Sequence, residues 1–170
     1  VASHEAIRLF FSVTASEELY AEGCDVDSAY LFGEMDVPIR MKQPTDSSQI
    51  IEMAGYDCLL IKSIYGSKQA GRIWGNTLDN TLRSWKFIQS KVEQRIYYFV
   101  RGTSYIILCV VVDDIAFASN NTELMAEFKS RISAQFSVKL YGKLKSFIRW
   151  TITQTPKAIT ITQEAYCKRL

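Results

Sequence analysis

Two adjacent aspartates lie inside a run of strand-forming residues, CVVVDDIAFAS, residues 109–119. A carboxylate that is buried without a partner is costly, so Asp113 and Asp114 need either solvent or a partner of opposite charge. The β-branched residues on both sides of the pair predict a strand, a tight turn that holds the carboxylates, and a second strand. Two interpretations follow. Asp-Asp is either turn chemistry, in which Asp bonds its own backbone, or a pair of carboxylates that share a cation.

The cation interpretation requires a third carboxylate from a neighbouring strand. Asp25 is the candidate, because it lies in a short strand expected around residues 24–26. Asp27 competes with it, since residues two apart on a strand share one face. Mg²⁺ prefers one or two carboxylates together with substrate phosphates. Two such ions, about 3.5–4 Å apart, hold the attacking and leaving oxygens of a phosphoryl displacement.

Composition narrows the class of protein. The 170 residues, of which 48% are apolar, are enough for one domain with a core and exclude a disordered chain. A formal net charge of +2 means that any contact with nucleic acid must come from a local basic patch. No apolar run is long enough for a membrane span. The single histidine, His4, gives no support to histidine-based catalysis, and we expect it at the surface or in a helix cap. The widely spaced cysteines are expected to be reduced: Cys24, Cys58, Cys109 and Cys167.

Apolar periodicity predicts helices over residues 6–18, 69–87 and 122–136. Ser3 is expected to cap the first helix, and Leu124, Phe128 and Ile132 are expected to face inward on the last. Strands are expected over residues 37–41, 58–61, 96–100, 104–112 and 115–118, and residues 43–55 are expected to form a loop. A last hairpin is expected from residues 147–153 and 158–162, with a helix beginning near residue 163. Helices mixed with antiparallel hairpins indicate an α+β fold, a sheet with helices on one face.

Four segments in order give a more specific signal. The first runs from GCDVDSAYLFGEM to IRMKQP, the second is KSIYGSKQAGRIW and the third is CVVVDDIAFAS. The fourth, YGKLKSFIRWTI, comes after a helix. This series resembles the reverse transcriptase of copia-type LTR retrotransposons, which has a DVxTAFLNG-like segment, YMKQP, a SLYGLKQAPRxW-like segment and YVDD. The resemblance covers nearly the whole chain. It implies a palm-like antiparallel sheet of the right-hand polymerases with part of the fingers, in one domain over residues 1–170. It also implies synthesis of DNA on an RNA or DNA template-primer from deoxynucleoside triphosphates.

The resemblance assigns roles residue by residue. Asp25, Asp113 and Asp114 match the catalytic aspartates and would hold two Mg²⁺ or Mn²⁺ ions, with Asp27 in second place. Tyr30 matches an aromatic residue under the incoming sugar, where it would exclude a ribose 2′-hydroxyl. Otherwise it is a core aromatic. Tyr65 and Gly66 match the floor of the nucleotide pocket.

Contacts with nucleic acid are expected from a further group. Lys68 and Arg72 either contact template phosphate or are solvated charges at a helix start, and Gln69 is expected to support that loop. Val111 stands in place of the family's Tyr in YVDD, where it would touch the primer end. Arg149 stands where the family has Gly in FLGI, and it either obstructs the primer backbone or makes a new phosphate contact. Gly71 replaces a family proline and loosens the turn before the helix.

The family also sets the expectations about context. Its upstream basic fingers segment and its downstream thumb and RNase H parts are expected outside this chain, in a polyprotein whose other parts are possible partners. The resemblance implies an intracellular location, in cytoplasmic particles, the nucleus or both. Two alternatives stay open. One is an inactive remnant that at most binds nucleic acid or protein, and the other is a small nuclease-like metal enzyme.

Overall fold

The computed structural model describes residues 2–43 and 56–168, and these form two compact units. The smaller unit is Ala29–Leu78, and the larger one contains the described residues before and after it. Helix α2 (Ala70–Ser84) begins in the smaller unit and ends in the larger one. Most of the expected loop over residues 43–55 lies outside the described residues. No described helix is both long enough and apolar enough to span a membrane.

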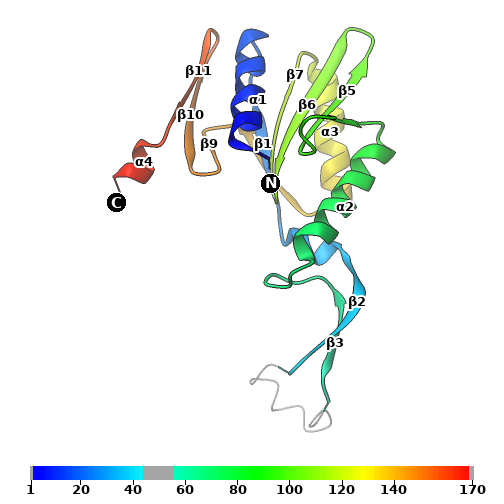
Figure 1. Ribbon diagram of the computed structural model, residues 1–170. Coiled ribbons are helices and arrows are strands. Elements are labelled where there is room, and N and C mark those ends of the chain that lie inside the picture. Colours follow the sequence, from blue (N-terminus) through cyan, green and yellow to red (C-terminus); the bar gives the residue numbers. More distant parts are fainter. Residues whose placement is uncertain (1, 44–55, 169–170) are drawn as a thin grey trace. The chain divides into compact units, whose positions relative to one another are not determined.

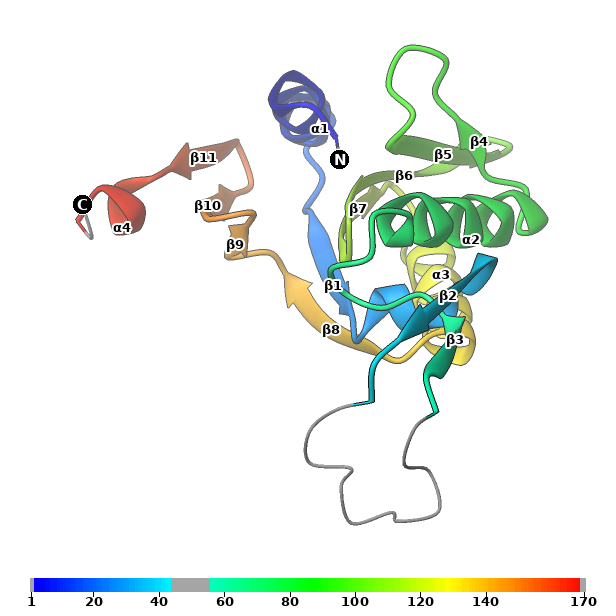
Figure 2. The same cartoon turned by 60° about the horizontal axis from the view of Figure 1, so that its bottom comes forward.

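A six-stranded antiparallel sheet forms the centre of the larger unit, in the order β4-β5-β6-β7-β1-β8 (Figures 1 and 2). Its strands are β1 (Glu22–Val26), β4 (Ile88–Gln89), β5 (Ile96–Arg101), β6 (Ser104–Val111), β7 (Asp114–Ser119) and β8 (Val138–Lys143). A three-stranded sheet of β9 (Ser146–Phe147), β10 (Trp150–Thr155) and β11 (Ala158–Thr162) follows. The helices of this unit are α1 (His4–Ser16), α3 (Thr122–Gln135) and the short α4 (Glu164–Cys167).

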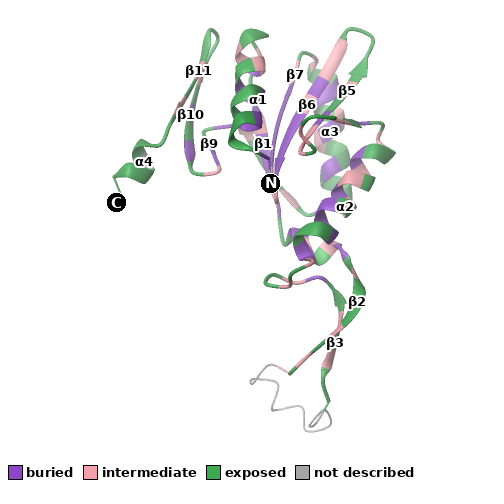
Figure 3. Cartoon of the chain, in the orientation of Figure 1, coloured by how far each residue is buried: buried purple, intermediate pink, exposed green. Residues whose placement is uncertain are grey.

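The two faces of the central sheet are covered by different helices. Along β7, Ile115 and Phe117 alternate with Ala116 and Ala118, and all four are buried (β7 is largely purple in Figure 3). The Phe117 ring lies 5.1 Å from the ring of Phe128 on α3. Both alanines instead belong to a buried cluster with the apolar residues of α1. Successive strand residues point to opposite faces, so α1 and α3 lie on opposite sides of the sheet. The expectation of helices on one face was therefore wrong.

Helix boundaries follow the predicted signals closely. The Ser3 side chain caps α1 by accepting the Ala6 N–H at 3.1 Å, as its position predicted. His4 is an exposed first-turn residue whose ring lies 5.4 Å from that of Trp150. Asn121 caps α3 in the same way through the Leu124 N–H. The buried residues of α3 include the three that were expected to face inward, Leu124, Phe128 and Ile132.

The structure differs from the prediction at two places in the last third of the chain. Residues 147–153 are not one strand, because Phe147 pairs with Trp150 and the chain reverses at Ile148 and Arg149. Strand β8 was not predicted at all, since Lys-x-Tyr-Gly-Lys lacks the apolar alternation of a half-buried strand. The hairpin around Pro156 and Lys157 is confirmed, with Thr155 paired to Ala158.

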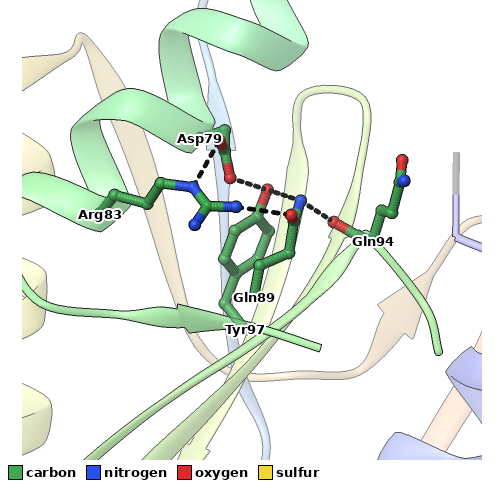
Figure 4. A network of polar contacts seen from close by, with 5 residues as sticks. All are labelled: Asp79, Arg83, Gln89, Gln94 and Tyr97. Atoms are coloured by element: carbon green, nitrogen blue, oxygen red, sulfur yellow. Dashed lines mark hydrogen bonds and ion pairs between the residues drawn. The ribbon is translucent and has the colours of Figure 1, made fainter. Parts of the chain in front are cut away.

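A polar network fastens the end of α2 to strands β4 and β5 (Figure 4). The Tyr97 side chain is fully buried, and its hydroxyl donates to Asp79 at 3.1 Å. Gln89 donates to the same hydroxyl at 3.1 Å, and Arg83 contacts both Asp79 and Gln89 at 2.7 Å. Each buried polar atom in this network therefore has a partner, as the interior requires.

The smaller unit contains a 3-10 turn, η1 (Ala29–Phe32), and a two-stranded ribbon of β2 (Glu34–Met41) and β3 (Cys58–Lys62). Gly33 is required at the base of the ribbon. A Cβ on it would lie 2.2 Å from Cγ2 of Ile73, and its carbonyl accepts the Ser63 N–H at 2.9 Å. The close approach of η1 to α2 thus depends on a missing side chain. The four cysteines form no disulfide, as expected.

Candidate active site

The larger unit brings two of the predicted carboxylates into direct register. Asp25 at the end of β1 pairs with Asp114 at the start of β7. Side chains of directly paired residues lie on the same face of a sheet, so both carboxylates point to the α1 side. Asp113 occupies the two-residue turn between β6 and β7, and its carbonyl accepts the Val26 N–H at 3.0 Å. Asp114 is therefore already a strand residue, and only Asp113 lies in the turn proper.

The turn itself is strained. Val112, its first central residue, has φ of +57°, a region that β-branched residues rarely adopt. A left-handed conformation costs about 1–2 kcal/mol for such a residue. Backbone strain of this kind gathers at functional sites, where the surrounding structure holds it in place. Here the pairing of β1, β6 and β7 on either side fixes the turn.

Tertiary structure separates Asp25 from its competitor. Asp27 is exposed and lies beyond the end of β1. Its carboxylate accepts the Ser137 hydroxyl at 2.9 Å, and its N–H donates to the Ser137 carbonyl at 2.9 Å. Asp25 is instead half-buried and sits between Asp114 on β7 and Lys139 on β8. The strand pairing favours Asp25 as the third carboxylate. Strand periodicity alone could not choose between Asp25 and Asp27.

Burial and charged neighbours perturb the carboxyl groups of Asp25 and Asp114. Burial, followed by the negative charges of Asp113 and Asp25, raises the pKa of Asp114 to about 6. Burial also raises the pKa of Asp25, with Asp113 and Asp27 adding to the rise and Lys139 opposing it. Burial is the main reason that the pKa of the neighbouring Cys24 thiol rises to about 12, so this thiol stays protonated. The raised pKa values mean that the ionised carboxylates are destabilised in this cluster, and a bound cation would stabilise them.

The donor set suits a hard divalent cation, because it consists of carboxylate oxygens. No three His, Cys, Asp or Glu side chains converge into a ready-made metal cage anywhere in residues 2–43 and 56–168. Mg²⁺ does not require such a cage, since it keeps several waters and binds substrate phosphates together with one or two carboxylates. The paired carboxylates thus fit an ion that arrives with its substrate.

The predicted nucleotide-binding residues lie together in the smaller unit. The rings of Tyr30 and Tyr65 are 4.5 Å apart, and the Tyr30 carbonyl accepts the hydroxyl of the buried Ser63. Tyr65 is 54% exposed, whereas Tyr30 is half-buried. Gly66 has φ of +92°, and open space surrounds the position of a Cβ. Glycine therefore suits this positive φ, and the lack of a side chain leaves the backbone of Gly66 accessible.

The polar residues predicted to contact nucleic acid at the start of α2 have different environments. Lys68 is exposed, and the Gln69 carbonyl accepts the Ile73 N–H at 2.9 Å, so the residue supports the start of the helix. Arg72 forms an exposed ion pair with Asp36 at 2.6 Å. This pairing competes with the predicted phosphate contact of Arg72, although an exposed pair contributes little stability.

The two residues predicted near the primer differ in their exposure to solvent. Val111 is buried in the cluster beneath α1, so its side chain offers little surface to a primer end. Arg149 is exposed at the β9–β10 turn, where Ile148 and Arg149 have φ of +44° and +72°. Two positive φ values in a two-residue hairpin are those of a type I′ turn, which favours Gly or Asn.

The sequence reasoning did not include Lys139 and Tyr141 of β8 among the residues near the carboxylates. Lys139 pairs in register with Asp25, and its Nζ lies 5.7 Å from the centre of the Tyr141 ring. The available signal was the alternation of basic and aromatic residues over residues 139–143. This signal points to the carboxylates only because β8 pairs with β1, and no local sequence pattern predicts that pairing.

Known proteins resemble this chain over most of its length. A family model described as reverse transcriptase (RNA-dependent DNA polymerase) matches residues 1–170. The chain is 30% identical to the retrovirus-related Pol polyprotein from transposon TNT 1-94 of Nicotiana tabacum, over all of the chain and 13% of that protein. It is also 30% identical to the retrovirus-related Pol polyprotein from transposon RE2 of Arabidopsis thaliana, over 98% of the chain and 11% of that protein. The putative transposon Ty5-1 protein of Saccharomyces cerevisiae is 30% identical over 84% of the chain and 46% of its own length. The chain therefore spans about one eighth of the length of the two plant polyproteins that it matches.

Proposed function

Because this chain belongs to the reverse transcriptase (RNA-dependent DNA polymerase) family, we propose that it catalyses templated DNA synthesis as part of a retrotransposon polyprotein. The central sheet of the larger unit would be the palm, and the smaller unit would be part of the fingers. The substrates would be an RNA or DNA template-primer and deoxynucleoside triphosphates. The expected location is intracellular, in cytoplasmic particles, the nucleus or both.

The observation that carries the proposal is the register of Asp25 with Asp114, next to Asp113 at a strained turn. These three carboxylates would hold two divalent cations. When bound, the cations would stabilise the charge that develops on the attacking and leaving oxygens of the nucleotidyl transfer. The protein would contribute mainly by positioning, because the pairing of β1 and β7 fixes both carboxylates before substrate arrives.

Residues of the smaller unit would position the nucleotide. The half-buried Tyr30 ring would lie under the incoming sugar, where a bulky group clashes with a 2′-hydroxyl. Its contact with Tyr65 would hold that ring in place. The open backbone at Gly66 would allow a base or sugar to approach closely.

Primer extension on poly(rA)·oligo(dT), with Mg²⁺ or Mn²⁺, tests the proposal. The samples are this chain and a version of the tobacco TNT 1-94 polyprotein whose matching segment is replaced by this chain. Each is compared with its Asp113→Asn variant and with Asp57→Asn, a control at an exposed carboxylate of the smaller unit. We expect extension by the polyprotein version, abolished by Asp113→Asn and retained by Asp57→Asn. Absence of extension by a folded polyprotein version would refute the enzyme and leave a remnant that at most binds.

A further inference from the structure

A small pocket opens between the end of α2, strand β5 and helix α3, and all of its lining residues belong to the larger unit. Its volume is about 150 Å³. Five of the lining residues are apolar or aromatic, namely Trp85, Phe87, Phe99, Leu124 and Phe128. The other four carry charge, and they are Lys86, Arg101, Glu127 and Arg131. We call this site the aromatic pocket, and the function proposed above uses none of these residues.

The aromatic pocket lies on the face of the central sheet that is opposite the candidate active site. The Phe87 ring lies 5.7 Å from the rings of both Phe99 and Phe128. Phe128 also contacts Phe117, so these rings lie on the α3 side of the sheet. The candidate catalytic carboxylates instead point to the α1 side. A ligand of this pocket would therefore not occupy the face that carries the carboxylates.

The apolar lining has a buried floor and a half-buried entrance. Phe87, Leu124 and Phe128 are at most 7% exposed, whereas Trp85 and Phe99 are half-buried. An apolar cavity of about this volume accommodates a benzene-sized group. The pocket therefore fits one phenylalanine or leucine side chain, whose burial would remove apolar surface from water. A nucleobase would instead need an exposed ring face on which to stack.

The charged residues of the pocket leave an excess of positive charge. Arg101 and Arg131 both donate to the Glu127 carboxylate, at 3.1 and 2.7 Å. One carboxylate thus serves two guanidinium groups, and each group has five N–H donors. Lys86 is exposed, and no carboxylate lies within ion-pair distance of it in residues 2–43 and 56–168. Three positive charges beside one negative charge favour an acidic ligand.

Lys86 occupies a backbone position that favours glycine. Helix α2 ends in a Schellman motif, in which the Phe87 N–H donates to the Leu82 carbonyl at 3.0 Å and the Lys86 N–H donates to the Arg83 carbonyl at 2.9 Å. The motif requires a left-handed residue at this point, and Lys86 has φ of +71°. Glycine would adopt this φ without steric cost, so the helix end itself does not require a lysine. Strain of this kind points to a role for the side chain, and this side chain lines the pocket.

We propose that the aromatic pocket binds an acidic peptide segment of a partner protein. One phenylalanine or leucine side chain of that segment would fill the pocket, and its neighbouring aspartates or glutamates would contact Lys86, Arg101 and Arg131. Carboxylates are the acceptors that guanidinium groups match best. A buried apolar anchor surrounded by less buried polar contacts is the usual arrangement of an interface hot spot. The inference goes beyond the proposed polymerase function and does not depend on it, because the two sites lie on opposite faces of the sheet.

Acrylamide quenching of tryptophan fluorescence tests the pocket with this chain. Of the three tryptophans, Trp74 and Trp150 are buried and Trp85 is half-buried, so acrylamide quenches mainly Trp85. The probe is the peptide EDFDE, which has one aromatic anchor between acidic residues. The comparison peptides are EDADE, which lacks the anchor, and KKFKK, which reverses the charge. We expect EDFDE to protect Trp85 saturably, EDADE to bind at least about tenfold more weakly, and KKFKK to give no protection.

The variant Lys86→Gly separates binding from stability, because it removes a charge and also relieves the strain. The matched control is Lys157→Gly, at an exposed lysine in the turn between β10 and β11, and Lys86→Arg keeps the charge. We expect Lys86→Gly to weaken EDFDE binding about three- to fivefold, as the loss of one exposed ion pair predicts. Its midpoint of urea unfolding should not fall. Lys157→Gly and Lys86→Arg should bind the peptide as the unchanged chain does.

Other occupants of the pocket would give different results. Protection of Trp85 by oligo(dT) that is lost in Lys86→Gly would overturn the proposal in favour of single-stranded nucleic acid. Self-association in sedimentation velocity that Lys86→Gly abolishes would overturn it in favour of a second copy of this chain. The proposal would also be overturned by absence of protection at up to about 1 mM EDFDE, by equal binding of EDADE, or by equal losses in Lys86→Gly and Lys157→Gly.

Discussion

Replacing Asp114 by asparagine should stabilise the metal-free chain at neutral pH. In the folded chain Asp114 keeps its proton up to about pH 6, whereas an ordinary aspartate titrates near 3.8. A raised pKa means that folding disfavours the charged carboxylate. The stability that Asp114 contributes is therefore complete below pH 3.8 and is lost as the pH rises through 6. A rise of about two pH units corresponds to about 3 kcal/mol. Because Asp114 is only half-buried, solvent screening reduces the expected effect to about 1–1.5 kcal/mol.

Urea unfolding in EDTA measures this effect. At pH 7 the Asp114→Asn variant should have a free energy of unfolding about 1–1.5 kcal/mol above that of the unchanged chain, and the gap should close toward pH 4. Asp57→Asn, at an exposed carboxylate, should show no such difference. Added Mg²⁺ should stabilise the unchanged chain and should have little effect on the Asp114 variant. A variant that is no more stable at pH 7, or a gap that does not narrow in acid, would refute the electrostatic reasoning.

Three further predictions concern stability and can be measured by the same urea unfolding at pH 7. Tyr97→Phe should cost about 1–2 kcal/mol, because Asp79 and the rest of the network lose a buried hydroxyl partner. A Tyr97→Phe variant with unchanged stability would contradict this. Arg149→Gly should stabilise the chain by about 0.5–1 kcal/mol, since relief of left-handed strain exceeds the added chain entropy. A loss of stability would show that the turn is not strained. Gly23→Ala should cost about 1–3 kcal/mol, because the new Cβ would lie 2.4 Å from Cδ2 of the buried Leu144. A neutral result would mean that Leu144 can move at little cost.

The locations of the helices were readable from the sequence because their signals are local. The capping hydroxyl of Ser3 and the spacing of Leu124, Phe128 and Ile132 each lie within one or two helical turns. The hairpin at Pro156 and Lys157 is confirmed for the same reason. Local signals fix such elements without information about distant parts of the chain.

Predictions from the sequence were wrong or missing where the structure depends on long-range packing. Nothing local indicated that Ala116 and Ile115 would be covered by different helices. The reversal at Ile148 and Arg149 was missed because neither residue is one that a type I′ turn favours. Strand β8 carries too many lysines to be read as a strand, and it is stabilised by pairing with β1.

By itself, the sequence determined the residue types of the candidate site, which are two adjacent aspartates in a β-rich run and a third near residue 25. It also determined the family, through four segments in a fixed order. Only the tertiary structure distinguishes Asp25 from Asp27, because Asp25 is half-buried and pairs with Asp114, whereas Asp27 lies exposed beyond β1 and binds Ser137. It also placed Lys139 of β8 in register with Asp25. The physical reason is the same in both cases. Residue type and local spacing are properties of a short segment, whereas the pairing of β1 with β7 and β8 joins segments about 90 and 115 residues apart along the chain.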